Sequence, residues 1–409
     1  MSKFTKPEKS WILYDVANSA FTMLISTTIP IFFRSLAEQD VSASTASGIW
    51  ALTTSVAVLI LAVLSPFLGA LADYKGMKKK MFSLFLLVGV IGLLLLSFSG
   101  NWISYMILFV ITRIGYSACN IFYDSMLVDV TADDRMDRIS SYGYALGYIG
   151  SCIPFIIGIL LILVRPFGLS TQAATQISFV ITALWWVGLT IPLLKNVHQT
   201  HYLENRSNQV SHALSRIGQT LKKIRKNPSV LYFIIAYFCY IDGVYTIISM
   251  ATTYGGEVGI SDTNMILALL LTQFIAFPCA IFAGNLAEKV GTLKVIRVSI
   301  LIYCGICIFG YQLDKAWEFW VLAVVVGMAQ GGIQSLSRSY FGRLIPKNES
   351  NEYFGFFDIF GKFADFFGPM IMSFCALVLG SSTYGILGLL LLFVVGYILL
   401  RKIPENQEK

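Results

Sequence analysis

The chain has 409 residues, of which 56% are hydrophobic and only 13% are charged, and its formal net charge is +7. Soluble domains carry about 25% charged residues, so this composition excludes a conventional soluble enzyme, and its hydrophobicity excludes intrinsic disorder. The positive balance alone would suit nucleic acid or anionic lipid as a partner, so the positions of the charges must decide between them.

Twelve runs of about 20 apolar residues predict twelve membrane-spanning helices. Their expected limits are 10–33, 45–72, 81–99, 102–128, 139–164, 174–194, 229–253, 263–287, 295–313, 317–340, 352–379 and 382–400. The predicted fold class is an all-α polytopic membrane protein. It has a six-helix bundle over 1–194, a basic cytoplasmic loop over 195–228 and a second six-helix bundle over 229–409.

The lysines and arginines indicate the orientation. If both termini are cytoplasmic, 25 of the 30 fall in inner segments and three in outer loops. Short cytoplasmic loops carry such an excess of positive charge. We therefore expect a multi-pass protein of the cell inner (plasma) membrane with both termini in the cytoplasm, and the net charge then requires no nucleic acid.

The first span places four polar side chains on one helical face: Asp15, Asn18, Thr22 and Ser26. Asp15 lies close to the inner surface. This position favours a gating or structural contact over substrate binding.

A loop pattern closes the second span and recurs after the eighth. The two segments are Gly69-Ala-Leu-Ala-Asp73-Tyr-Lys-Gly76-Met-Lys-Lys79 and Gly284-Asn-Leu-Ala-Glu288-Lys-Val-Gly291-Thr-Leu-Lys294. They are 215 residues apart, and the same shift carries Pro154 onto Pro369. Parallel six-helix repeats are a known plan of secondary transporters. An ordinary turn with a capping glycine and basic flanks would explain one loop but not its duplication.

The loop at 69–79 resembles the signature loop of the major facilitator superfamily, and the repeat pattern covers the whole chain. The resemblance implies the two-bundle fold of that superfamily. It also implies that the loop acid pairs with basic groups at neighbouring helix ends and holds one conformation of the two halves. Asp73 matches this acid, and Glu288 matches it in the second half.

A narrower resemblance lies in Trp11-Ile-Leu-Tyr-Asp15-Val-Ala-Asn18-Ser-Ala-Phe21, which is similar to the opening of the vacuole effluxer family. This family holds autophagy-related amino-acid effluxers and bacterial relatives. Asp242-Gly243, Gly332-Ile-Gln-Ser-Leu-Ser-Arg338 and Gly361-Lys362 fit the same family. The chain resembles the bacterial branch, and the resemblance implies an amino-acid-like solute.

The fourth span again carries a polar face: Arg113, Ser117, Asn120 and Asp124. Arg113 lies near the midplane, in the place of the superfamily's span-4 arginine. Its planar guanidinium can hold a carboxylate or phosphate through two hydrogen bonds. The alternative is an internal salt bridge to an acid on another span.

The central loop holds seven basic residues against one acid, and Leu214, Ile217, Leu221 and Ile224 recur at helical spacing. This pattern predicts a basic amphipathic helix on the inner leaflet. The three histidines of the chain, His198, His201 and His212, also lie here. No cysteine or acid cluster joins them, so we predict a solvated loop and no metal site or cofactor.

The seventh span carries Asp242, Thr246, Ser249 and Thr253 on one face. A substrate that alters the surroundings of a buried carboxylate also alters its protonation. Asp242 is therefore our first candidate for proton coupling, with a structural pairing to Arg113 or Lys362 as the alternative.

The tenth and eleventh spans complete the set of charges. The tenth carries Gln330, Gln334 and Arg338 on one face, and the eleventh carries Asp358, Lys362 and Asp365 at helical spacing. The acid–base–acid ladder either neutralises itself or lets Lys362 exchange partners between the two halves as a cavity opens to each side.

Ionised side chains within a membrane are costly and mark function by default. We predict a monomeric secondary active transporter that moves a small polar or amphipathic solute by alternating access, coupled to protons or another ion. No P-loop is present, and no catalytic motif or histidine lies in a span, so no enzyme is predicted. The alternatives are a lipid or glycolipid flippase of the same fold and a non-transporting membrane receptor or scaffold.

Overall fold

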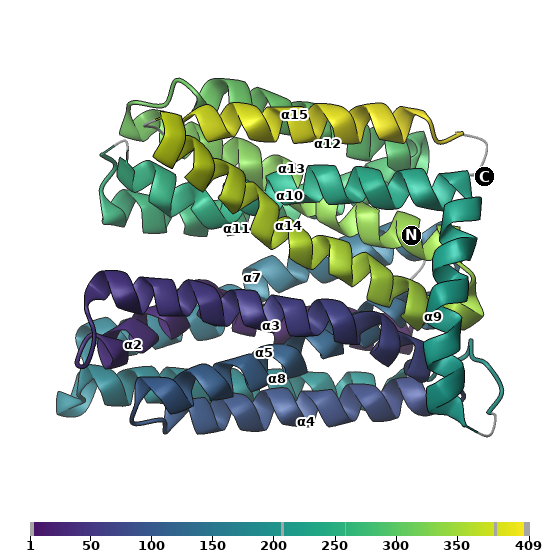
Figure 1. Ribbon diagram of the computed structural model, residues 1–409, viewed down its shortest axis with the longest axis horizontal. Coiled ribbons are helices and arrows are strands. Elements are labelled where there is room, and N and C mark those ends of the chain that lie inside the picture. Colours follow the sequence, from purple (N-terminus) through teal and green to yellow (C-terminus); the bar gives the residue numbers. More distant parts are fainter. Residues whose placement is uncertain (1–3, 206–207, 258, 380–382, 405–409) are drawn as a thin grey trace. The chain divides into compact units, whose positions relative to one another are not determined.

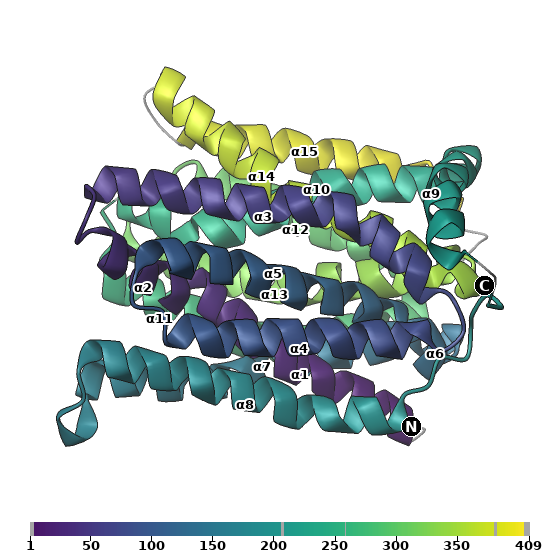
Figure 2. The same ribbon diagram turned by 60° about the horizontal axis from the view of Figure 1, so that its bottom comes forward.

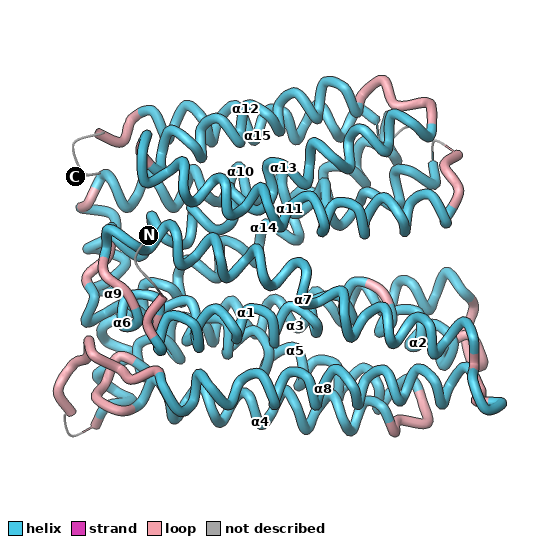
Figure 3. Tube along the Cα trace, turned by 180° about the vertical axis from the view of Figure 1, so that it is seen from behind, coloured by secondary structure: helices cyan, strands magenta, loops and turns pink. Residues whose placement is uncertain are grey.

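The protein is described from a computed structural model, which covers residues 4–205, 208–257, 259–379 and 383–404 (Figure 1). Within these residues, twelve helical segments are long and apolar enough to cross a membrane. The predicted all-α polytopic fold is therefore confirmed. Figure 3 shows how short most of the connecting loops are beside the helices.

The helices follow one another along the chain as α1 (Lys6–Ser26), α2 (Thr28–Ala37), α3 (Ala43–Ala72), α4 (Met77–Ser97), α5 (Trp102–Ser125), α6 (Leu127–Val130), η1 (Asp133–Arg135), α7 (Met136–Val164), η2 (Pro166–Gly168), α8 (Thr171–Asn196), α9 (Gln209–Lys226), α10 (Pro228–Glu257), α11 (Asp262–Val290), α12 (Thr292–Gly310), α13 (Ala316–Leu344), η3 (Lys347–Glu349), α14 (Ser350–Leu379) and α15 (Thr383–Arg401). Elements labelled η are single 3-10 turns.

The first predicted span consists of two helices. Thr5 and Glu8 form a reciprocal capping box that begins α1, and the helix then breaks at Thr27, whose φ and ψ of −134° and −80° are not helical. The fourth span also consists of two helices, because α5 ends at Ser125 and the short α6 follows after Met126, whose torsions stay helical.

The described chain divides into two compact units. Unit 1 contains Met1–Val130, Leu146–Ala213 and Asn348–Gly355, and unit 2 contains Thr131–Ala145, Leu214–Lys347 and Phe356–Lys409. This division differs from the predicted bundles over 1–194 and 229–409. The start of α7 belongs to unit 2, the start of α14 belongs to unit 1, and α9 is shared.

In unit 1, α4 packs on α5 and α1 packs on α8 (Figure 2). Gly89 and Gly115 let α4 and α5 approach closely, because a Cβ on Gly115 would lie 2.4 Å from the backbone nitrogen of Gly89. The segment that resembles the effluxer family supplies aromatic packing: Trp11 stacks on Tyr123 with ring centroids 4.5 Å apart, and Phe21 stacks on Trp186.

In unit 2, α11 packs on α13, α10 packs on α15, and α12 packs on both α13 and α15. Gly243 of α10 faces the ring of Phe393 on α15, which a Cβ would meet at 2.5 Å. Close packing between these helices therefore depends on small residues, as is common within membranes.

Candidate functional site

The repeated loops place four glycines where the backbone requires them. Gly76 has φ of +73° and Gly291 has φ of +98°, and each begins the helix after its loop. Positive φ strains any residue with a Cβ. At the first glycine of each loop, a Cβ on Gly69 would lie 2.2 Å from the carbonyl oxygen of Asn351, and one on Gly284 would lie 2.6 Å from Ser141.

These close approaches define two equivalent places in the fold. The N joint, in unit 1, is the contact of the 69–79 loop with the start of α14: Gly69, Asp73, Lys78, Asp129, Ser350 and Asn351. The C joint, in unit 2, is the contact of the 284–294 loop with the start of α7: Gly284, Asp137, Ser141, Thr292, Ser339 and Arg343.

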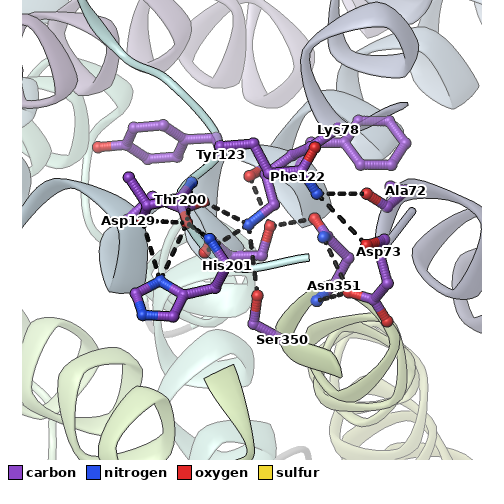
Figure 4. A network of polar contacts seen from close by, with 12 residues as sticks. Ala72, Asp73, Lys78, Phe122, Tyr123, Asp129, Thr200, His201, Ser350 and Asn351 are labelled. Carbon is purple, nitrogen blue, oxygen red and sulfur yellow. Dashed lines mark hydrogen bonds and ion pairs between the residues drawn. The ribbon is translucent and has the colours of Figure 1, made fainter. Parts of the chain in front are cut away.

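Asp73 caps α14 in the N joint (Figure 4). Its Oδ1 accepts the backbone N–H of Asn351 and that residue's side-chain amide, both at 2.9 Å, and its Oδ2 accepts the N–H of Glu352 at 3.3 Å. The first N–H groups of a helix lack internal partners and attract negative charge. The resemblance implied that Asp73 pairs with basic groups. The hydrogen bonds described for its carboxylate come instead from the amides of Asn351 and Glu352 at the start of α14.

Lys78 forms a buried ion pair beside this cap. Its Nζ lies 2.6 Å from Asp129 Oδ2, and it also donates to the Ser125 carbonyl and to Ser350 Oγ. The Lys78 and Asp129 side chains are 1% and 0% exposed. The ammonium is therefore held by α5, α6 and the start of α14 together (Figure 4).

The first part of the central loop lies along the N joint. Asp129 Oδ1 accepts the backbone N–H groups of Thr200 and His201, both at 2.9 Å. Leu203 N–H donates to the Asp73 carbonyl, and the His212 ring lies 2.6 Å from the Tyr74 hydroxyl. Two of the loop's histidines thus pack against Asp129 and Tyr74 within unit 1, which differs from the predicted solvated loop.

The C joint uses an acid from the opposite side of the contact. Asp137, in the first turn of α7, is 3% exposed. Its Oδ2 accepts the Thr292 hydroxyl at 2.6 Å and Arg343 Nη1 at 2.9 Å, and its Oδ1 accepts the Ser339 hydroxyl. Here α7 brings the acid to the loop and to α13.

The other predicted members of the repeated motif lie nearby. Glu288 is exposed and forms no ion pair with any residue that the structure describes. Lys79 donates to the Val197 carbonyl at 3.1 Å. Arg338 of α13 is buried, donates to Ser140 Oγ at 2.9 Å and lies 4.3 Å from the centroid of the Tyr144 ring.

The predicted polar residues of unit 1 lie on α1 and α5, and several meet. Asn18 donates to Asn120 at 3.0 Å, and the Thr22 hydroxyl lies 2.6 Å from that of Tyr116. The Arg113 guanidinium lies 5.9 Å from the centroid of the Tyr116 ring. The buried Asp15 and half-buried Asp124 lie on the same two helices.

The predicted charges of unit 2 lie on α10 and α14. Asp242 is 1% exposed, and its Oδ1 accepts the backbone N–H of Gly368 at 2.8 Å, just before Pro369. Lys362 forms an ion pair with Asp358, one turn earlier on α14. Asp365 is also in α14, but its side chain lies outside the described part of the chain.

A mostly apolar cavity of about 100 Å³ lies within unit 2, lined by residues of α10 to α15. Thr246 and Gln330 contribute polar atoms to its lining. Thr246 Oγ1 and Gln330 Oε1 are both buried, with no hydrogen-bond partner among the described residues. Gln334 lies one turn after Gln330 on α13 and is also buried.

Sequence reasoning missed the joint partners. Lys78, Asp129, Asp137, Asn351 and Arg343 carry most of the polar contacts there, yet none was predicted. One signal was present, because the 215-residue shift that relates the loops also carries Asp137 onto Glu352. This correspondence relates the start of α7 to the start of α14, and each of these helix starts contacts one of the two loops.

The sequence profile of the family described as "Vacuole effluxer Atg22 like" matches residues 41–409. The chain belongs to this family. The match includes the segments around Asp242, Arg338 and Lys362 and confirms the resemblance to this family, while the Trp11–Phe21 segment lies before the matched residues.

Relatives of this effluxer-family chain occur in bacteria and fungi. It is 44% identical to the "Uncharacterized MFS-type transporter YxiO" of Bacillus subtilis (strain 168) over 413 residues, which cover 99% of this chain and 96% of that one. It is 28% identical to Autophagy-related protein 22-1 of Penicillium rubens over 267 residues, or 58% of this chain and 43% of the fungal protein. The chain thus matches less than half the length of that relative.

Solved structures show the fold. The proton:xylose symporter XylE superposes with a TM-score of 0.75 at 12% identity, covering 99% of this chain and 96% of XylE. The human organic anion transporter MFSD10 gives the same TM-score and identity, with 97% and 99% covered. The effluxer-family chain is therefore a multi-pass membrane transporter of the major facilitator fold.

Proposed function

We propose that this transporter is a secondary active carrier that couples a small amphipathic, amino-acid-like solute to protons. It works by alternating access in the cytoplasmic membrane, with both termini in the cytoplasm. The observation that carries the proposal is the buried carboxylate of Asp242, one turn before Thr246, which lines the cavity of unit 2.

Asp242 is suited to gain and lose a proton. It lies at the middle of α10, where an isolated charge is costly. One of its hydrogen bonds comes from the Gly368 N–H, which is neutral and can donate to either protonation state of the carboxyl group. A change in the polarity around Asp242 therefore shifts its proton affinity, which links occupancy of the neighbouring cavity to proton binding.

The cavity favours a solute with a mainly apolar body and a few hydrogen-bonding groups. Thr246 lies one turn from Asp242, and a Cβ on Gly368 would contact both Thr246 Oγ1 and Asp242 Oδ1. The unpartnered Thr246 hydroxyl and Gln330 carbonyl can receive donors from a solute, because buried polar atoms without partners are costly. Most of the rest of the lining is apolar and suits an aliphatic or aromatic group.

Two further charged groups have supporting roles in this proposal. The Arg113 guanidinium is the candidate for binding a solute carboxylate, since its geometry allows two parallel hydrogen bonds. The Lys362–Asp358 pair is the candidate for partner exchange during the transport cycle, because its two members lie one turn apart on one face of α14.

The first experiment identifies a probe. Thermal unfolding of purified protein is measured with amino acids, dipeptides, sugars and lipid head groups at two pH values. We expect stabilisation by an apolar amino acid or a compound of similar chemistry, because a ligand that binds only the folded state raises its stability. Stabilisation by sugars alone would contradict the proposed solute class.

The second experiment tests coupling in proteoliposomes with that probe. Asp242→Asn keeps an oxygen that can accept the Gly368 N–H but cannot ionise. We expect loss of uptake driven by a pH gradient, with the unfolding temperature and solute counterflow retained. Asp314→Asn is the matched control, because Asp314 is an exposed carboxylate in an outer loop. Driven uptake that persists in Asp242→Asn, or counterflow that is lost with it, would refute the coupling role.

A further inference from the structure

An apolar groove of about 250 Å³ lies where α9 meets the transmembrane helices of unit 2. Its wall includes Leu221 and Ile224 from α9, Ile234 and Ile235 from α10, and Phe360 from α14. Figures 1 and 2 show α9 lying crosswise to α10, at the end of that helix. One wall of the groove is thus α9, which lies crosswise to the membrane-spanning helices. The other wall is formed by α10 and α14.

The charged residues that α9 brings to this groove are all basic. Arg225 is part of the lining, and it is exposed and has no ion-pair partner among the described residues. Lys222 and Lys226 are exposed one turn apart on α9, next to Arg225. The whole of α9, from Gln209 to Lys226, contains no acidic residue. An anion at the mouth would therefore meet three cations and no carboxylate of that helix.

The apolar side of α9 is also only partly covered. Ile224 is buried within unit 2, whereas Leu214 and Leu221 are each 56% exposed. The predicted strip of Leu214, Ile217, Leu221 and Ile224 is therefore divided between the protein and its surroundings. A helix with exposed leucines on one side and lysines beside them suits the boundary between head groups and acyl chains.

We propose that the groove binds an anionic glycerophospholipid of the inner leaflet. One acyl chain lies between α9, α10 and α14, and the phosphate is held by Arg225 with Lys222 and Lys226. Arginine binds phosphate through two parallel hydrogen bonds, and each basic side chain adds attraction for an anionic head group. The lipid joins the crosswise helix to the bundle. This site is separate from the cavity beside Asp242 and does not depend on the proposed transport activity.

The test uses the full chain in phosphatidylcholine nanodiscs or mild detergent. Binding of dioleoyl phosphatidylglycerol is titrated by native mass spectrometry, in parallel with dioleoyl phosphatidylcholine and with free glycerol phosphate. We expect saturable binding of phosphatidylglycerol, with little binding of the zwitterionic lipid and of the head group without chains. Equal binding of phosphatidylcholine, or full competition by glycerol phosphate, would overturn the proposal.

Variants separate the two halves of the site. Arg225→Gln and Lys222→Gln should each weaken binding about fivefold. A basic residue near an anionic membrane surface contributes about 1 kcal/mol to binding, which corresponds to about that change in affinity. Ile235→Trp, which fills the groove from a half-exposed position, should also reduce binding while leaving every charge in place. Lys289→Gln is the matched control, because Lys289 is an exposed lysine at the end of α11.

The unfolding temperature of each variant in phosphatidylcholine shows whether it is folded. Loss of binding in Arg225→Gln and in Ile235→Trp, but not in Lys289→Gln, supports the site. An equal loss in Lys289→Gln would show that general surface charge attracts the lipid. Full retention in folded Ile235→Trp would show that no chain occupies the groove. Either of these results overturns the proposal.

Discussion

In the N joint the acid lies on the loop and reaches the start of α14, whereas in the C joint the acid lies on the start of α7 and reaches the loop. Asp73 accepts backbone N–H groups, and Asp137 accepts Thr292, Ser339 and Arg343. Glu288, the counterpart of Asp73 in the repeated sequence, is exposed. The two loops therefore share glycines at the close contact and at the positive φ, and they differ in the chemistry of their contacts.

The difference shows which part of a repeat is hard to replace. Glycine is the residue that adopts a positive φ without strain and leaves room for a close helix contact. Both loops have glycine at both of these positions. Negative charge near the first turn of a helix can come from either partner. In the C joint this charge is on the helix start, where Asp137 accepts from two hydroxyls and an arginine.

The largest expected effect concerns the buried ion pair between Lys78 and Asp129 in the N joint. Lys78→Met leaves Asp129 buried without its cation, and breaking such a pair costs about 3–5 kcal/mol. The corresponding residue of the C joint is the buried Leu293. We expect the free energy of unfolding, measured in detergent by denaturant titration, to fall by that amount.

The control for this change is Lys75→Met. Lys75 lies 3.8 Å from Glu204 with both side chains at least half exposed, so its loss should cost less than about 1 kcal/mol. The double variant Lys78→Met/Asp129→Leu should recover part of the stability, because no buried charge remains. A loss in Lys78→Met no larger than in Lys75→Met would argue against a structural ion pair.

A smaller effect is expected from neutralising the acids. In Asp73→Asn one of the two acceptor oxygens becomes an amide that faces the N–H groups of α14. Hydrogen bonds to charged groups contribute about 1.5–3 kcal/mol, and we expect a loss in that range. Asp137→Asn should cost a similar amount, because its carboxylate also has several donors.

Glu288→Gln sharpens the same comparison. Exposed substitutions usually change stability by no more than about 0.5 kcal/mol, so this variant should unfold like the parent protein. Circular dichroism across the same denaturant titration measures all three variants side by side. If Glu288→Gln were as damaging as Asp73→Asn, the second loop would depend on its own acid, and Asp137 would not be its replacement.

Much of the fold was predictable, because a membrane sets both the length and the polarity of each span. The predicted limits of spans such as 45–72 and 317–340 lie within a few residues of α3 and α13. The break at Thr27 was not predicted, although Pro30 marks it, because a proline cannot donate to the carbonyl four residues earlier, here that of Ser26. The joints were only half predictable: local sequence marks the turn at Gly76, but Asn351 lies 278 residues from Asp73. No local pattern identifies so distant a partner.

The smallest expected differences concern the first glycine of each loop. Overpacking a tight contact costs about 1–3 kcal/mol. Gly69→Ala should lie at the upper end, because its Cβ would meet the backbone carbonyl of Asn351, which cannot turn away. Gly284→Ala meets the Cβ and hydroxyl of Ser141, a small side chain. The same unfolding titration should therefore give a smaller loss for Gly284→Ala.

A second substitution separates the two cases. Removing the Ser141 side chain in Gly284→Ala/Ser141→Gly opens the space that the new methyl group needs, and part of the lost stability should return. For Gly69→Ala the obstacle is a carbonyl that every residue at position 351 carries, so Asn351→Gly should give no rescue. Rescue of Gly69→Ala by Asn351→Gly would mean that side chains set this contact. Side-chain packing would then limit the space at Gly69, as it does at Gly284 in the C joint. A close contact with a backbone carbonyl would no longer explain the glycine at position 69.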